Sequence, residues 1–432
     1  MSPLAADPAS HGRRRPGRRC RPRTIDPRAP RPSALLITFF APAILMLLAS
    51  ALAALAYVIT GRDWLHWLAL HLALLGGVSQ LVLGAGQFFV CAFLATDPPP
   101  RRLIAGQLVA WNAGTLLVAV GVPTASSPLT DTGGALIAVG LVLFAAALRG
   151  MQRRSLQRAR WAVRWYQACA ACLGVGALIG ILLARGTPWQ AGSMLGAHLA
   201  LNLVGWLGMA IVGTLHTFFP SLTQTRLRFP VLQGPTFTLW LLGVAQLALG
   251  AAFSVAFVIA AGWLALMLAA CLLTVNVGAS LHAAPRPLAL PAQLMSLAQA
   301  FLTAGLMFAL AMTISKGPGG PLLGAERSVL AVLLLAGWIG LTICGALLHL
   351  LAVLARVRRF SVAMPAPAPV RDPALVFAAG LAISAMAASR VPSLSVLDGP
   401  ATVVVLMILT LLGVRVLGLA RRALRAPAGA GS

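Results

Sequence analysis

Histidine is the residue type in this 432-residue chain with the clearest capacity to bind a metal. His71 and His198 each lie a few residues inside a long apolar run, and Asn202 follows His198 at a spacing of four. That spacing places Asn202 on the same helix face as His198. Neutral imidazole is a common ligand of copper and haem iron. His71 and His198 are therefore candidate metal ligands, with Asn202 as a supporting polar neighbour.

The same two histidines also fit a structural interpretation, in which each ring is buried and hydrogen-bonded to a neighbouring helix. Carboxylates offer no rival site, because all eight acidic residues lie in tails, loops or the ends of apolar runs. They are Asp7, Asp26, Asp63, Asp97, Asp131, Glu326, Asp372 and Asp398. A transporter coupled to protons or cations usually keeps a carboxylate within the membrane, so this pattern disfavours that class.

The cysteines favour packing over chemistry. Cys169 and Cys172 form a CxxC, but it lies inside an apolar helical run, where we interpret both as small packing residues rather than a redox or metal site. None of the six cysteines falls in an expected external loop, so a disulfide framework is not predicted.

The composition indicates lipid as the main solvent of the chain. Hydrophobic residues make up 59%, charged residues only 9%, and the mean hydropathy is +0.90. A soluble domain of this size needs a larger polar surface. The net charge of +25 comes from arginines in the N-terminal tail and between apolar runs, which is typical of membrane proteins rather than nucleic-acid binders. The lipid bilayer is the expected partner, and nucleic acid is not.

Twelve apolar runs predict an all-α, polytopic membrane helix bundle. Residues 1–33 are expected to be a disordered basic cytoplasmic tail, 34–420 the bundle and 421–432 a short cytoplasmic tail. A short echo between residues 80–84 and 246–250 is too little to predict an internal repeat. The expected spans are 34–60, 65–94, 103–122, 134–148, 162–184, 193–219, 236–255, 257–281, 292–316, 328–354, 374–389 and 400–420, of which the fourth and eleventh are short.

The arginines give the bundle an orientation. With twelve spans and a cytoplasmic N-terminus, the inner segments hold most of them, including six from Arg149 to Arg164. The outer loops hold only Arg62, Arg185, Lys316, Arg327 and Arg390. Both termini are therefore predicted to be cytoplasmic. The preference for arginine, with Lys316 as the only lysine, suggests the plasma membrane of a high-GC bacterium.

Two stretches carry a family resemblance. One runs from His71 through Gly77 to Gly84, and the other includes Arg164–Gln167, Gly196–Gly208 and Gly213–Thr217. With the span count, they resemble the twelve-span membrane part of bacterial copper-oxidase-like proteins, which is related to the catalytic subunit (subunit I) of haem–copper oxidases. The resemblance implies a haem–copper oxidase subunit I-like fold and copper or haem as cofactor.

The departures from that family limit the expected function. In the family, the second and tenth spans ligate haem, and the sixth and seventh hold copper. In this chain only His71 and His198 stand where such ligands would be; the seventh span has no histidine, and His349 lies at the opposite membrane face. A complete oxygen-reducing centre is therefore not expected, which disfavours an enzyme.

We expect a degenerate bundle that binds copper or haem, for metal handling or a nitric-oxide or redox response, with redox or copper-handling partner proteins. The alternative from the same residues is a metal-free transporter or permease of a small solute.

Overall fold

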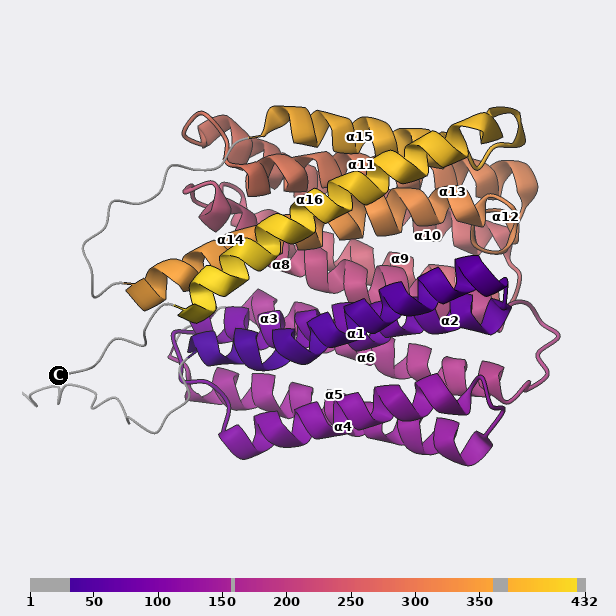
Figure 1. Ribbon diagram of the computed structural model, residues 1–432, viewed down its shortest axis with the longest axis horizontal. Coiled ribbons are helices and arrows are strands. Elements are labelled where there is room, and N and C mark those ends of the chain that lie inside the picture. The colour runs from indigo at the N-terminus through magenta and orange to yellow at the C-terminus, as the bar shows by residue number, and fades with distance from the viewer. Residues whose placement is uncertain (1–31, 157–159, 360–371, 426–432) are drawn as a thin grey trace, which may run out of the picture.

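The computed structural model of the chain describes residues 32–156, 160–359 and 372–425. In these ranges every regular element is helical, and Figure 1 shows the long helices side by side along one axis of the bundle. The predicted tail at 1–33 lies outside the described residues except at Pro32 and Ser33, where the first helix begins.

Eleven helices of the described chain are long and apolar enough to cross a membrane, and Pro373–Ala388 is a shorter apolar helix beside them. The prediction of a polytopic membrane helix bundle is confirmed at this level. Large apolar side chains also cover the outside; Leu52 and Val58 of the first helix are 69% and 78% exposed. Such a surface is suited to lipid. The protein is an integral, multi-pass membrane protein.

The helices follow the predicted spans closely. In chain order they are α1 (Pro32–Thr60); α2 (Asp63–His71), η1 (Leu72–Val78) and α3 (Ser79–Phe93) in the second span; α4 (Arg101–Gly121); α5 (Ser127–Arg154); α6 (Arg160–Ala184); α7 (Met194–Leu199), η2 (Ala200–Gly208) and α8 (Met209–Leu222) in the sixth; η3 (Pro230–Leu232) with α9 (Gln233–Ala252); α10 (Ala256–Ala283); α11 (Leu290–Lys316); α12 (Gly320–Leu323); α13 (Arg327–Ala331), η4 (Val332–Gly340) and α14 (Leu341–Arg359) in the tenth; α15 (Pro373–Ala388); η5 (Pro392–Leu397); and α16 (Asp398–Arg425).

Two spans extend beyond the sequence prediction. The fourth span, expected at 134–148, is the 28-residue helix α5, in which Ser127–Gly133 and Arg149–Arg154 continue the helix at its two ends. The last helix continues to Arg425, beyond the predicted bundle end at 420, since arginine is a good helix former. The start of α1 and the end of α16 lie at the same end of the bundle (Figure 1).

Three spans contain a stretch of wider π-helix. These stretches are η1, η2 and η4, in the second, sixth and tenth spans, each flanked by α-helix. A π-helical stretch shifts the helical register and is frequently found at functional sites. Both candidate ligands stand at such a shift: His71 directly precedes η1, and His198 lies two residues before η2.

The backbone reveals an internal repeat that the sequence did not predict. Ala95 and Gln224 have positive φ angles of 44° and 56°, and Ala125 and Ser254 have 53° and 55°. In each pair the second residue follows the first by 129 positions. The loop hydrogen bonds repeat at the same spacing: Thr96 N–H donates to the Cys91 carbonyl as Thr225 N–H donates to that of Pro220. The second to fourth spans and the sixth to eighth spans are therefore two copies of one scaffold.

In each copy, one tryptophan indole donates a hydrogen bond to a carbonyl of the π-helical stretch. The Trp111 indole N–H donates to the Leu75 carbonyl at 3.2 Å, and the Trp240 indole N–H donates to the Val204 carbonyl at 3.0 Å. These acceptors belong to η1 and η2, where the altered register leaves carbonyls that need other donors. The indole bonds thus hold the helices that carry the candidate site.

Candidate metal site

His71 is held by its own helix. Its Nδ1 lies 2.9 Å from the Trp67 carbonyl, one turn earlier, and its ring stacks on the Trp67 indole with ring centres 4.0 Å apart. A carbonyl only accepts, so Nδ1 carries the proton and donates. The Nε2 of His71 therefore keeps its lone pair.

His198 is held by the neighbouring helix α6. Its Nδ1 lies 2.8 Å from the Gly176 carbonyl, while the Asn202 amide nitrogen donates to the His198 carbonyl at 2.7 Å. The same amide nitrogen is 3.2 Å from Nδ1, but the shorter contact to a carbonyl requires the proton to be on Nδ1. His198, like His71, thus keeps the lone pair on Nε2.

The two imidazoles are neighbours. Their ring centres are 6.5 Å apart, with the planes tilted by 30°. The sequence placed them at one depth, and the structure brings them together from the second and sixth spans. Among the described residues no hydrogen bond engages either Nε2. Two rings bound to one metal through bonds of about 2 Å would have centres about 5–6 Å apart, so a small approach would let them share it.

Two glycines create the space for the His198 side. A Cβ at Gly176 would lie 2.6 Å from the Asn202 amide nitrogen, and a Cβ at Gly180 would lie 3.0 Å from the His198 ring. Both distances are too short for any larger residue without movement. The side chains of His198 and Asn202 thus pack against the face of α6 that carries these two glycines.

Further protein ligands are few. No group of three or more histidine, cysteine or acidic side chains of metal-binding geometry exists in the described part of the chain. The pair therefore supplies two nitrogen donors, and a metal would complete its coordination with water, a carbonyl or a cofactor's own atoms. Histidine nitrogens are donors that copper and haem iron both accept, so His71 and His198 would be the residues to hold either.

Three other histidines of the described chain lie in different surroundings. His66 is exposed and lies against the Tyr57 ring, at 5.2 Å between ring centres. His216 is buried between helices, 6.2 Å from the Trp165 ring, and His349 lies 5.3 Å from the Phe218 ring. None of them joins the pair.

Cys169 and Cys172 lie in the packed interior of the bundle. Both are buried and unpaired by disulfide. The Cys169 thiol donates to the Tyr166 carbonyl at 3.2 Å, and Cys172 fills the space in front of Gly205. This arrangement agrees with the packing interpretation.

Sequence reasoning missed Trp67 and the carbonyl of Gly176. The signal for Trp67 was present, since an aromatic residue one turn before a histidine can stack on it. The Gly176 partner had no comparable signal, because it depends on the register between two helices.

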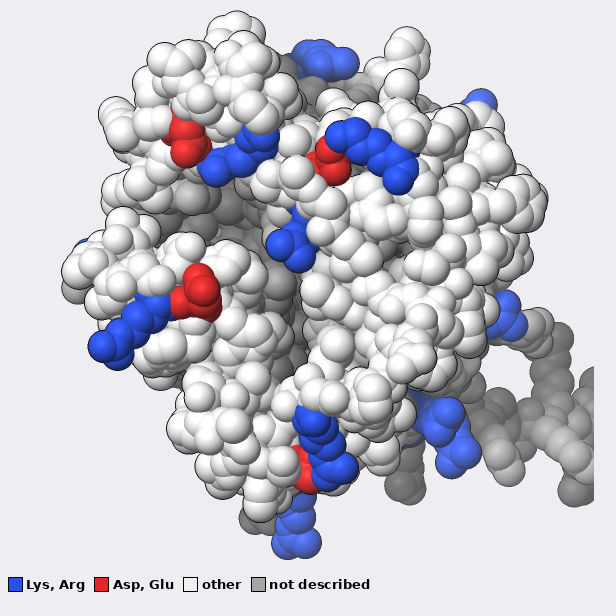
Figure 2. All heavy atoms as spheres, turned by 90° about the vertical axis from the view of Figure 1, so that its right-hand side faces the viewer, with Lys and Arg blue, Asp and Glu red and all other residues white. Residues whose placement is uncertain are grey.

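The end of the bundle nearest the pair is edged by ion pairs (Figure 2). They join Arg185 to Asp131, Lys316 to Glu326 and Arg390 to Asp398. The hydrogen bond from Lys316 lowers the pKa of Glu326, and the hydrogen bond to Asp131 raises the pKa of Arg185. Figure 2 also shows this face hollowed between the helices. Most cations of this end are thus neutralised locally.

Comparison of the sequence with family models and with curated proteins gives no match. No family model matches the chain, and no curated protein sequence matches it. The assignment of a function consequently depends on the geometry.

Proposed function

We propose that this integral membrane protein binds a metal, as copper or as haem iron, between His71 and His198. The proposal treats the chain as a degenerate relative of the haem–copper oxidase membrane part, as its sequence resemblance implies. Its role would be metal handling or a nitric-oxide or redox response, with redox or copper-handling proteins as partners. Two histidine ligands are too few for the oxygen-reducing centre of that family, so catalysis is not part of the proposal.

One observation carries the proposal. Both imidazoles donate Nδ1–H to a backbone carbonyl and leave Nε2 without a hydrogen bond, at a ring separation of 6.5 Å. Histidines that ligate metals almost always donate their other ring N–H in this way, which fixes the tautomer and the ring orientation. Both histidines are half-buried, and neither Nε2 is among the fully buried nitrogens that lack a partner, so each lone pair can be reached by a metal.

Metal and haem content of the detergent-purified protein tests the proposal. His71→Ala and His198→Ala should each abolish binding of copper or haem while the variants stay folded. His66→Ala is the matched control, because His66 is on the same helix as His71 but exposed, and it should bind as the wild type does. Wild-type protein that takes up neither copper nor haem would overturn the proposal and favour the metal-free transporter.

The proposed location is a bacterial plasma membrane, with both termini cytoplasmic. The shared end of α1 and α16 supports termini on one side, and the arginine excess supports the cytoplasmic side (Figure 1). Reporter fusions at Gln157, which follows α5 in the sequence, and at Ser127, the first residue of α5, should report the inner and outer sides respectively. Signals from the same side would contradict this topology.

A further inference from the structure

A basic loop, Arg226–Val231, joins the sixth span to the seventh at the end of the bundle opposite the histidine pair. It follows α8 and leads through η3 into α9. Arg226 and Arg228 are exposed, whereas Leu227 between them is half-buried. This alternation of exposure indicates that both arginine side chains face away from the bundle.

The basic loop is held in place by the rest of the protein. Directly before it, the Thr225 N–H donates to the Pro220 carbonyl at 2.8 Å. Within it, the Phe229 N–H donates to Asn276 Oδ1 at 3.0 Å, and the Asn276 amide nitrogen donates to the Phe229 carbonyl at 3.1 Å. Asn276 is only 2% exposed, so it fixes the loop from inside the bundle. A loop that is already ordered loses little conformational entropy when it binds a ligand.

The charges of the basic loop have no counter-ion among the described acidic residues. Neither Arg226 nor Arg228 forms an ion pair with any of them. The guanidinium carbon of Arg228 lies 5.9 Å from the centre of the Phe229 ring, a contact that supplies no anionic acceptor for its N–H groups. At the histidine end, by contrast, three cations are each paired with a carboxylate.

Apolar side chains lie beside the two arginines. Phe229 is 38% exposed and Val231 is 76% exposed. The loop connects the ends of two spans, so these side chains lie near the boundary between the hydrocarbon core and the lipid headgroups. Aromatic and aliphatic side chains at that boundary insert among the upper parts of the acyl chains. The basic loop therefore combines positive charge with an apolar surface that suits lipid.

The first copy of the repeat lacks this combination. The residues that precede Arg226, Arg228 and Asn276 by 129 positions are Asp97, Pro99 and Ala147. An alanine cannot hold a loop as Asn276 does, and an aspartate opposes the binding of an anion. The arginines and the asparagine that holds their loop are thus particular to the second copy.

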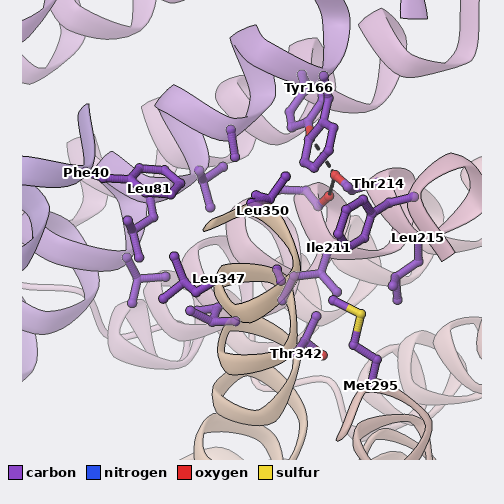
Figure 3. Close-up of a pocket in the computed structure, with 18 residues that line it drawn as sticks. Phe40, Leu81, Tyr166, Ile211, Thr214, Leu215, Met295, Thr342, Leu347 and Leu350 are labelled. Carbon is purple, nitrogen blue, oxygen red and sulfur yellow. Dashed lines mark hydrogen bonds between the residues drawn. The ribbon is translucent and has the colours of Figure 1, made fainter. Parts of the chain in front are cut away.

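Polar groups deeper in the sixth span are satisfied by the protein itself. Thr214 lies at the wall of an apolar cavity of about 90 Å³ and donates to the Ala210 carbonyl at 2.6 Å. The Tyr166 hydroxyl, 2.5 Å from Thr214 Oγ1, therefore donates to Thr214 (Figure 3). A ligand that requires charged partners is consequently expected at the basic loop rather than at this cavity.

We propose that the basic loop binds the phosphate of an anionic phospholipid. Arg226 and Arg228 hold the phosphate through guanidinium N–H groups, whose geometry matches phosphate oxygens. Phe229 and Val231 contact the glycerol and acyl region of the same lipid. In the proposed topology this end faces the cytoplasm, where the leaflet carries anionic lipid. The binding does not depend on the proposed metal function.

Native mass spectrometry of the full-length, detergent-purified protein tests the proposal. The protein is titrated with phosphatidylglycerol or with phosphatidylcholine of the same acyl chains. The wild type should bind its first phosphatidylglycerol at least about tenfold more tightly, because choline cancels the charge of the phosphate that two arginines attract. The double variant Arg226→Gln/Arg228→Gln should lose this preference. Glycerol phosphate should compete poorly, since without acyl chains it gains nothing from Phe229 and Val231.

The double variant Arg101→Gln/Arg102→Gln is the matched control. These two exposed arginines begin α4, at the same end of the bundle in the first copy, so the substitutions remove the same charge without touching the basic loop. The control should keep the preference for phosphatidylglycerol. Equal affinity of the wild type for both lipids, an equal loss in the two double variants, or competition by glycerol phosphate as effective as by phosphatidylglycerol would overturn the proposal.

Discussion

The two copies of the internal repeat share a scaffold and differ in their polar side chains. Trp111 and Trp240 occupy equivalent positions and make equivalent bonds to η1 and η2. Gly114 packs on the Gly133 carbonyl in the first copy, and Gly243 on the Gly262 carbonyl in the second. Contacts preserved in both copies are those that build the bundle.

The candidate ligands do not follow the repeat. The position equivalent to His71 is Ala200, and the position equivalent to His198 is Ala69; both alanines are buried. Each histidine is therefore particular to its own copy, whereas the scaffold is common. The difference separates the contacts that both copies use to maintain the fold from the two histidines of the candidate site, which occur once each.

The largest effect is expected at the shared glycines. A Cβ at Gly133 would lie 2.9 Å from the Gly114 carbonyl oxygen, and a Cβ at Gly262 would lie 3.0 Å from that of Gly243. Gly133→Leu and Gly262→Leu should each destabilise the protein by about 3 kcal/mol, because two helix backbones are forced apart. The detergent melting temperature measures this loss.

Gly278→Leu is the control for that experiment, since a Cβ there meets nothing within 4 Å. It should melt near the wild-type temperature. A large loss in only one copy would contradict the equivalence of the two scaffolds.

A smaller loss of stability, equal in the two copies, is expected when Trp111 or Trp240 is replaced. Trp111→Phe and Trp240→Phe each remove a bond to a π-helical carbonyl and should cost about 1–2 kcal/mol. Trp263→Phe should cost less, because the buried Trp263 indole N–H has no partner among the described residues. Equal losses in all three variants would show that ring volume, rather than the hydrogen bond, matters.

Where the copies differ, leucine substitutions at equivalent positions are expected to change the stability in opposite directions. Gln87 donates to the Gln107 side chain at 3.0 Å, so Gln87→Leu should destabilise by about 1 kcal/mol. The equivalent residue is His216, whose two ring nitrogens are buried without a partner, so His216→Leu should be neutral or stabilising. Urea or thermal unfolding of both variants measures the difference, and a destabilised His216→Leu would point to a bound partner at that ring.

The smallest effect lies outside the repeat, at Asp372, which caps α15 and pairs with Arg415. The hydrogen bond from Arg415 lowers the pKa of Asp372. Its contribution to stability is therefore present above the ordinary aspartate pKa, near 4, and is lost as the pH falls through the lowered value. Asp372→Asn should lower the melting temperature slightly at pH 7 and less at pH 3. An equal difference at both pH values would contradict a role for the charge.

The sequence predicted the positions of the helices better than it predicted how neighbouring helices contact one another. Apolar length placed nearly every span, and depth along the helices placed His71 beside His198. The repeat escaped detection because many of its equivalent positions hold different residues, such as Leu108 and Phe237, that pack equally well. The π-helical stretches are also hidden, because they follow from contacts between helices, such as Trp111 with Leu75, and not from local propensity.

The site was predicted in part for the same reason. Residue type and depth identified the two histidines and Asn202, all within one short stretch of each helix. The partners that fix the tautomers, the Trp67 and Gly176 carbonyls, are backbone atoms and carry no signature in the residue types. For His198, only the relative placement of α6 and the sixth span shows that Nε2 is left available.

The most direct test of the metal proposal is anomalous X-ray diffraction from crystals of the metal-loaded protein, recorded at the copper and iron absorption edges. The proposal predicts one anomalous peak between the second and sixth spans, about 2.0–2.1 Å from Nε2 of both His71 and His198. It also predicts that the peak is lost in crystals of His198→Ala. A peak bound elsewhere, or metal-loaded crystals with no peak between the two imidazoles, would contradict it.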